Sequence, residues 1–261
     1  MIDHYVWFVW SSAFLIPWLG LYLGVPARRR VMLRASLLTM PFGLTEPLFV
    51  PAYWSPPSLF DLAQRTGFDL ESLIFSFAIG GVGLVLYDVF TRRVTVRLSA
   101  GERQHVRHRL HRLALAAPVL AFPPLLLLHW NPIYPAIVAM GTGALAAIAC
   151  RPDLKARTLV GALLFLTFYS VLLLALEATA PGYIGRTWNI PALSGLLIAG
   201  LPVEELLFAA AFGGYWSAVY EHLAWSTSAM LTSPAGAAAN STDLSTELLP
   251  RGRDSYQTRK S

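Results

Sequence analysis

The chain has 261 residues, of which 55% are hydrophobic and only 13% are charged, and its mean hydropathy is +0.52. About a quarter of the residues of a soluble domain are charged, so this composition excludes an ordinary soluble domain and predicts a polytopic membrane protein. The single cysteine, Cys150, excludes an intramolecular disulfide and a multi-cysteine metal site.

Seven apolar runs approach the roughly 20 residues that a helix needs to cross a bilayer. They lie at about residues 5–25, 31–50, 70–91, 110–130, 133–150, 156–179 and 195–223. The fourth run contains Pro118, Pro123 and Pro124, which kink a helix unless neighbouring groups satisfy the freed carbonyls. The first run lacks a basic leader and a small-residue cleavage site, so we expect it to remain as a span. The prediction is an all-α membrane protein with seven transmembrane helices.

The basic residues predict the orientation, because short cytoplasmic loops carry an excess of Lys and Arg. Eighteen of the twenty fall on one side of the predicted spans, and only Arg65 and Arg186 fall on the other. We therefore expect a multi-pass protein of the cytoplasmic membrane, with its N-terminus outside and its C-terminus in the cytoplasm. The net charge is +5, but the basic residues border the predicted spans and do not form a separate domain. This distribution favours anionic lipids over nucleic acid as the partner.

The long basic loop at residues 91–112 carries His105, His108 and His111 among its arginines. We interpret it as a solvated, lipid-facing segment. The histidines are too interleaved with arginine to indicate a metal site, and no metal or cofactor is predicted.

An approximate internal repeat is the most informative pattern in the chain. Residues 68–75 recur about 133 residues later as residues 201–208. Continued without a gap, this alignment pairs Gly80-Gly81 with Gly213-Gly214 and Asp88 with Glu221. With a connector helix between the copies, both enter the membrane in the same direction, as parallel repeats do. The predicted divisions are a first three-helix repeat (1–91), a basic loop with a connector helix (92–130), a second repeat (131–225) and a disordered cytoplasmic tail (226–261).

The repeat gathers acidic residues toward the outer ends of the predicted helices. They are Glu46, Glu71, Glu177, Glu204 and Glu205. Acids are costly in an apolar span and usually mark a functional site there. Adjacent helical side chains diverge by about 100°, so at least one of Glu204 and Glu205 is expected to face the protein interior. Capping of a helix N-terminus is the alternative. The pattern favours function over capping for Glu204, and it favours neither for Glu205, whose counterpart is Ser72.

Two further acids, Asp88 and Glu221, also recur, but they fall near the cytoplasmic ends of spans. We interpret them as members of structural ion pairs. The paired glycines are expected to allow close packing of helices.

The segment Pro202-Val203-Glu204-Glu205-Leu206-Leu207-Phe208 follows an outer Trp188 and an acid at the end of the preceding span. In this it resembles the lycopene cyclase domain family, whose members are two small three-helix subunits or one fused chain. The resemblance covers roughly residues 5–223. The chain departs from the family in its first copy, Asp69-Leu70-Glu71-Ser72, and it has Thr45-Glu46 and Leu176-Glu177 where members carry Trp-Asp.

The resemblance implies cyclisation of an end of lycopene within the bilayer, by protonation, ring closure through a carbocation and proton loss, without net redox change. It implies Glu204 and Glu71 as the main acid and base candidates, with Glu177, Glu46 and Glu205 setting the local charge. Which carboxyl is acid and which is base stays open, as do the number of ends cyclised and the oligomeric state. The substrate pocket is expected to be lined by aromatic residues, namely Trp188, Trp54, Phe208, Phe75 and Tyr215.

Three other functions fit parts of the pattern. An intramembrane protease of the CAAX-processing type also carries a Glu-Glu pair, but its motif continues to an arginine where this chain has Ala209. A transporter would suit parallel repeats, particularly with acids at mid-depth and broken helices. A non-catalytic membrane partner of an isoprenoid enzyme is the third alternative.

Overall fold

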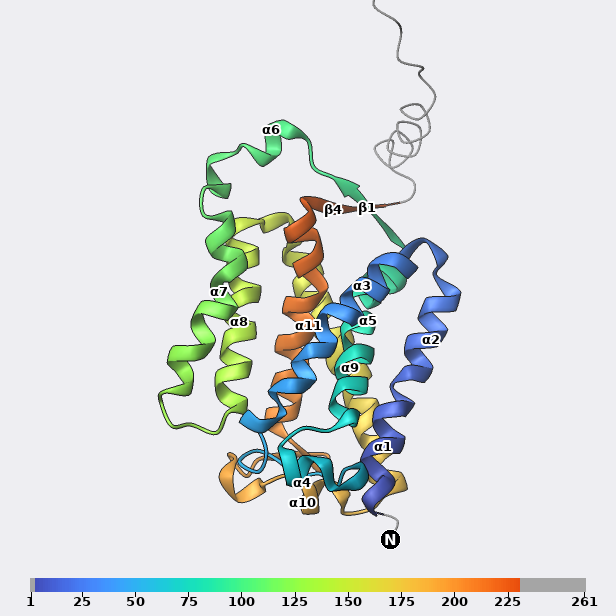
Figure 1. The fold of residues 1–261 in the computed structure, drawn as a ribbon. Coiled ribbons are helices and arrows are strands. Elements are labelled where there is room, and N and C mark those ends of the chain that lie inside the picture. The colour runs from blue at the N-terminus through green and yellow to red at the C-terminus, as the bar shows by residue number, and fades with distance from the viewer. Residues whose placement is uncertain (1–2, 231–261) are drawn as a thin grey trace, which may run out of the picture.

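In the computed structural model, residues 3–230 are described, and they form an elongated bundle of helices (Figure 1). The structure is 76% helical, as the all-α prediction requires. The α-helices are α1 (Asp3–Ala13), α2 (Leu15–Gly24), α3 (Arg29–Thr39), α4 (Leu62–Thr66), α5 (Leu70–Thr91), α6 (Ala100–Arg103), α7 (His111–Leu126), α8 (Ile133–Cys150), α9 (Lys155–Thr179), α10 (Tyr183–Thr187) and α11 (Val203–Ala224). The 3-10 helices are η1 (Pro26–Arg28), η2 (Met40–Leu48), η3 (Leu59–Asp61), η4 (Val106–His108), η5 (Pro152–Leu154) and η6 (Ile190–Ala192).

Among residues 3–230, four helices are long and apolar enough to cross a membrane, which makes this a membrane protein. They are Tyr5–Gly24, Leu70–Thr91, Ile133–Cys150 and Pro152–Thr179. The other predicted spans fall on α3 with η2, on α7 and on α11. These are shorter, broken or acid-bearing, and the arrangement of seven spans in two repeats stays a prediction.

Prolines account for the breaks in the first two predicted spans. The first divides into α1 and α2 at Phe14, and Pro17 lacks the amide that would bond to the carbonyl of Ala13. The second changes from α3 to the 3-10 segment η2, which contains Pro41 and Pro47. This change of helix type alters the direction of the side chains that follow, including Glu46.

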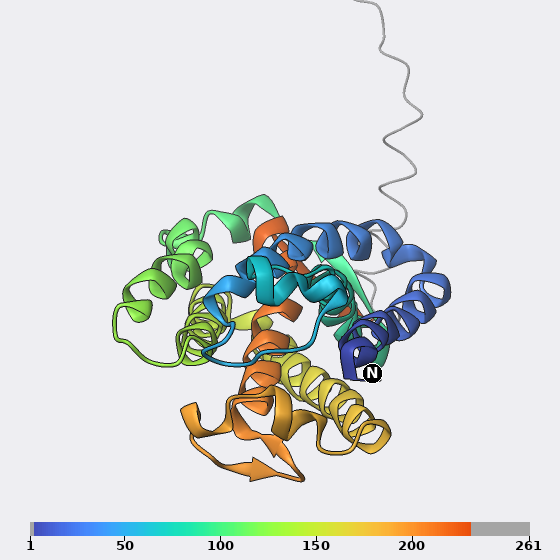
Figure 2. The same cartoon turned by 60° about the horizontal axis from the view of Figure 1, so that its bottom comes forward.

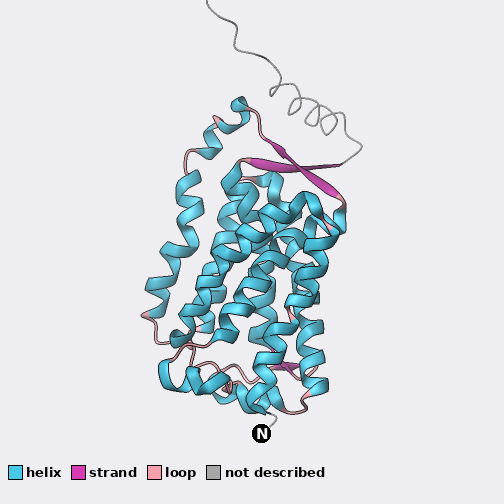
Figure 3. Cartoon of the chain, turned by 45° about the vertical axis from the view of Figure 1, so that its right-hand side comes forward, coloured by secondary structure: helices cyan, strands magenta, loops and turns pink. Residues whose placement is uncertain are grey.

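Two small sheets interrupt the helices, one at each end of the bundle (Figure 3). At the end that carries the basic loop, called the basic end below, β1 (Arg93–Arg97) pairs antiparallel with β4 (Ser226–Met230). The predicted disordered tail therefore begins too early: residues 226–230 form a strand, and the rest of that prediction lies outside the described residues. The β1 and β4 strands directly follow α5 and α11, which the predicted repeat makes equivalent.

At the opposite, N-terminal end, β2 (Leu197–Ile198) and β3 (Leu201–Pro202) form a hairpin. The seventh predicted span was expected to start near residue 195, but α11 begins only at Val203. Gly195, Ala199 and Gly200 all have positive φ, which a helix does not accommodate.

Helix α11 runs through the middle of the bundle, with α7 and α8 on one side and α1, α2 and α5 on the other (Figure 2). It packs closely against α9 at Gly213. A Cβ atom there would lie 2.8 Å from the carbonyl oxygen of Gly161 and would also overlap Phe165. Gly80 and Gly81 similarly admit Thr39 of α3 and Trp18 of α2. The predicted role of these glycines in close helix packing is confirmed.

We expect Gly213→Ala to lower the free energy of unfolding by about 1–3 kcal/mol, because the added methyl must push α9 away. Gly141→Ala in α8 is the matched control, since nothing lies within 4 Å of a Cβ atom at that position. It should be neutral or stabilising by up to about 1 kcal/mol through helix propensity. Thermal unfolding of both variants in the same detergent measures the difference, and equal midpoints would contradict the packing argument.

Candidate active site

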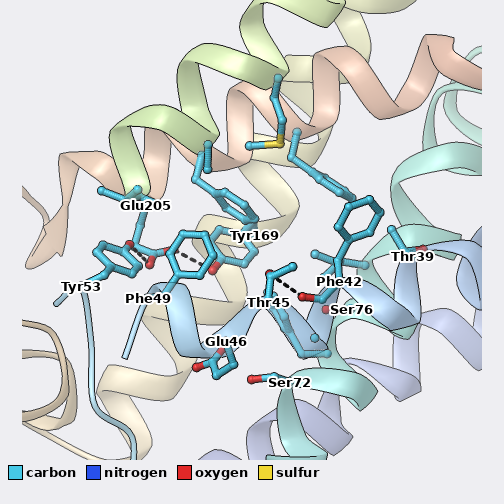
Figure 4. A pocket seen from close by; sticks show the side chains of 18 of the residues that line it. Thr39, Phe42, Thr45, Glu46, Phe49, Tyr53, Ser72, Ser76, Tyr169 and Glu205 are labelled. Carbon is cyan, nitrogen blue, oxygen red and sulfur yellow. Dashed lines mark hydrogen bonds between the residues drawn. The ribbon is translucent and has the colours of Figure 1, made fainter. Parts of the chain in front are cut away.

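A cavity of about 490 Å³ lies inside the bundle, between the helices of the first half and those of the second (Figure 4). Its wall is mostly apolar and rich in aromatic rings. The five aromatic residues predicted to line a pocket, Trp54, Phe75, Trp188, Phe208 and Tyr215, all belong to this wall. Two of the predicted acids, Glu46 and Glu205, also line it.

Glu205 lies in the first turn of α11 and is buried, with 4% of its surface exposed. Three side chains donate hydrogen bonds to its carboxylate. The Trp188 indole donates to Oε1 at 2.6 Å, the Tyr169 hydroxyl donates to Oε2 at 2.7 Å, and the Tyr53 hydroxyl donates to Oε1. Both oxygens are thus held by donors, so the carboxylate is fixed in direction and suited to hold negative charge against a cation in the cavity.

These three donors come from different parts of the chain. Tyr169 belongs to α9, Trp188 to the loop after α10, and Tyr53 to the first half of the chain, 152 residues before Glu205. Backbone bonds hold the two loops together: Asn189 donates to the Tyr53 carbonyl at 2.9 Å, and Ser55 donates to the Thr187 carbonyl at 2.8 Å. The site is therefore composite, because neither half of the chain supplies all the donors.

Glu46 reaches the same cavity from η2 and is 7% exposed. It lies near the side chains of Ser72, Trp54 and Asp69, and Figure 4 shows it beside Ser72. Its Oε1 atom is buried and has no hydrogen-bond partner. Burial of a charged carboxylate with an unpartnered oxygen is costly, so this environment suits the neutral, protonated form.

The other three predicted acids do not line the cavity. Glu204 is buried, and its Oε1 accepts hydrogen bonds from the Tyr134 hydroxyl at 2.7 Å and the Ser194 amide at 2.8 Å. Glu71 is buried and accepts one from the Leu59 amide at 2.7 Å. Glu177 accepts from the amides of Gly182 and Ile184 at 2.5 and 3.1 Å. Each of these three carboxylates holds a loop at the N-terminal end of the bundle through hydrogen bonds from backbone amides.

Tyr53 and Tyr169 were not among the predicted site residues. Tyr53 lies in the loop that follows η2, and it is only 5% exposed and points to Glu205. Tyr169 lies in α9 between Thr167 and Ser170, so its hydroxyl does not stand out in the sequence, and no local signal identifies it as a site residue.

The opposite, basic end of the bundle holds a separate buried cluster of charges. Arg157 pairs with Asp88 at 2.6 Å and with Glu221 at 3.0 Å, and Arg28 also contacts both acids. The predicted structural role of Asp88 and Glu221 is confirmed. Neither acid lines the cavity, so among the described residues the acids that face it are Glu46 and Glu205.

A comparison with known families matches one part of the chain. The family model described as lycopene cyclase matches residues 131–223, a segment that contains α8, α9, α11 and Glu205. No curated protein and no solved structure matches the chain significantly. Over residues 131–223, this chain is therefore similar to the lycopene cyclase family.

Proposed function

We propose that this membrane protein is a carotenoid cyclase that closes a ring at an acyclic end of lycopene or a related apolar isoprenoid. The observation that carries the proposal is the aromatic cavity with two buried carboxyl groups in unlike surroundings: Glu205 with three donors and Glu46 with an unpartnered oxygen. Neighbouring carboxyls in unlike surroundings favour different protonation states. The match of residues 131–223 to the lycopene cyclase family supports the same chemistry.

In the proposed reaction, Glu46 in its protonated form donates a proton to the terminal double bond. The chain then closes on itself through a carbocation, whose charge is stabilised by the ionised Glu205 and by aromatic faces such as Trp54 and Phe208. The carboxylate left on Glu46 accepts the proton released from the ring. One proton enters and one leaves, so the product is an isomer of the substrate and no oxidant or reductant is needed.

The volume and the lining of the cavity support a long apolar substrate, one end of which enters the cavity. A volume of about 490 Å³ is in the range of small-molecule pockets and suits part of such a molecule. The cavity wall includes residues that are exposed on the outside of the bundle, Phe42 of η2 and Val119 and Pro123 of α7. The rest of the substrate would extend between η2 and α7 into the bilayer.

The position of the acids favours an enzyme over a transporter. A transporter of this layout would carry its acids at mid-depth, whereas Glu205 lies in the first turn of α11 and Glu46 near the end of η2, toward the N-terminal end of the bundle. The paired acids at the basic end, Asp88 and Glu221, are held by arginines and do not line the cavity.

Expression in bacteria that accumulate lycopene tests the proposal. We expect conversion of lycopene to a product of unchanged mass with a shorter conjugated system, detected by chromatography and absorption, and no conversion with the empty vector. Unchanged lycopene in cells whose membranes contain the folded protein would overturn the assignment of this substrate.

We expect Tyr169→Phe to reduce kcat by about 10–100-fold, because one oxygen of Glu205 loses its donor in the cavity wall. Tyr169 is a positioning residue, so the loss should fall on kcat more than on KM and should shift the pH profile of the reaction. Tyr22→Phe, on α2 and away from the cavity lining, is the control. Equal rates for the Tyr169 variant and the parent would contradict a role for this bond.

A further inference from the structure

A second group of reactive side chains lies at the basic end of the bundle, away from the cavity. His108 of η4, His111 at the start of α7 and Cys150 at the end of α8 meet there. The Cys150 Sγ atom is 3.6 Å from Nδ1 of His108 and 3.5 Å from Nδ1 of His111. All three residues are buried, and their ligand atoms lie within 4.8 Å of one another.

A fourth histidine borders this group. The ring centroid of His222, on α11, is 4.5 Å from that of His111, and the Trp225 ring stacks on His111 with centroids 3.8 Å apart. His222 is only 2% exposed, and its Nε2 atom is buried without a hydrogen-bond partner. A buried ring nitrogen without a partner is unfavourable unless something binds it, so this atom is a second, independent indication that a ligand binds here.

The neighbouring positive charge does not prevent a cation from binding. Arg151 follows Cys150 directly, but its guanidinium is paired with Asp153 at 2.6 Å and donates to the carbonyls of Ser226 and Glu221. A thiolate would add one negative charge to the group. The sequence predicted no metal-binding role for these histidines, because arginines are interleaved with them. The spacing of the histidines does not show that the fold brings them to Cys150.

We propose that His108, His111 and Cys150 bind a divalent ion of the Zn²⁺ class, with His222 as the fourth donor. Imidazole and thiolate ligands around Zn²⁺ have bond lengths of about 2.0–2.3 Å, which at tetrahedral angles separates neighbouring donors by roughly 3.3–3.8 Å. The two distances from Cys150 to the histidines already lie in this range. With four protein donors the ion has no open position, as in structural zinc sites.

The ion would join three parts of the chain at the basic end. His108 and His111 end the basic loop, Cys150 ends α8, and His222 lies in the last turn of α11. The site therefore fastens the loop and the connector helix α7 to the second half. This role is independent of the cyclase reaction, because none of the four residues lines the cavity.

Cobalt binding tests the proposal on the full-length protein in detergent. After treatment with a chelator, the protein should bind about one Co²⁺ per chain with a thiolate charge-transfer band and the intense visible bands of tetrahedral cobalt. Zn²⁺ should displace the cobalt and raise the midpoint of thermal unfolding. Absence of the charge-transfer band would overturn the proposal.

Three variants locate the site. Cys150→Ser should abolish the charge-transfer band and weaken Zn²⁺ binding by more than about 100-fold, because the loss of a direct ligand exceeds the 10–100-fold effect of outer contacts. His222→Ala should retain the band but lose the tetrahedral visible spectrum. His129→Asn, at an exposed histidine of the opposite end, is the control and should bind like the parent. If a variant elutes as an aggregate, the parent protein still tests the proposal through its Co²⁺ spectrum and the displacement of Co²⁺ by Zn²⁺. Unchanged Co²⁺ and Zn²⁺ binding by folded Cys150→Ser would refute the site.

Discussion

Glu205→Gln is expected to lower the rate of cyclisation by about 10²–10⁴-fold while leaving the protein folded. Glutamine has the same size, and its amide oxygen can still accept the hydrogen bond of Trp188 while its amide nitrogen donates to the Tyr169 oxygen, but it cannot hold the negative charge that opposes the carbocation. The rate is measured as conversion of lycopene in isolated membranes, normalised to the amount of protein.

The neighbouring substitution Glu204→Gln distinguishes two assignments of the same chemistry. Glu204 fastens the Tyr134 and Ser194 segments outside the cavity lining, so we expect a loss of less than about tenfold. If Glu204→Gln lowered the rate of cyclisation more than Glu205→Gln, the main catalytic role would belong to Glu204, which the sequence analysis named as a main candidate.

Arg157→Leu is expected to have the largest effect on stability, a loss of about 3–5 kcal/mol. The side chain is 2% exposed and pairs with both Asp88 and Glu221, so its removal leaves two buried carboxylates with Arg28 as their remaining cation. Thermal unfolding in detergent, or the yield of folded protein in membranes, measures the loss.

Two comparisons separate the effect of this cluster from the general effect of removing an arginine. Arg34→Leu, at an exposed position of α3 with the same change of charge, should shift stability by less than about 0.5 kcal/mol. Adding Asp88→Asn to Arg157→Leu should restore part of the loss, because it removes one of the unpaired charges. A double variant less stable than Arg157→Leu alone would contradict this account.

The helical class and the residue types of the site could be predicted from the sequence, because they depend on local composition. Four of the predicted spans appear as long apolar helices, and all five predicted aromatic residues line the cavity. The choice between Glu204 and Glu205 could not be made, because it depends on the rotation of α11 relative to α9. Both acids are buried, but only Glu205 faces Tyr169.

Contacts between segments that are far apart in the sequence could not be predicted either. Strand β1 carries the alternating Val94-Thr95-Val96 pattern of a strand, yet its partner, Ser226–Met230, has no such pattern. Likewise, no spacing in the sequence relates Cys150 to His108. These pairings depend on how the helices pack against one another. The periodicity of a single sequence carries no information on that packing.

The hydrogen bond from Tyr53 to Glu205 also bears on how such a protein could be divided. If the chain were cut within the basic loop, the piece ending there would keep Tyr53 and Glu46, and the other would keep Tyr169, Trp188 and Glu205. Neither piece alone would assemble the donors around the carboxylate, so each should be inactive and the two should complement each other when co-expressed. The family match covers only the later piece, residues 131–223, but its carboxylate depends on a tyrosine outside that match. A shortened protein that contained only residues 131–223 would therefore lack Tyr53, one of the three donors that hold the Glu205 carboxylate.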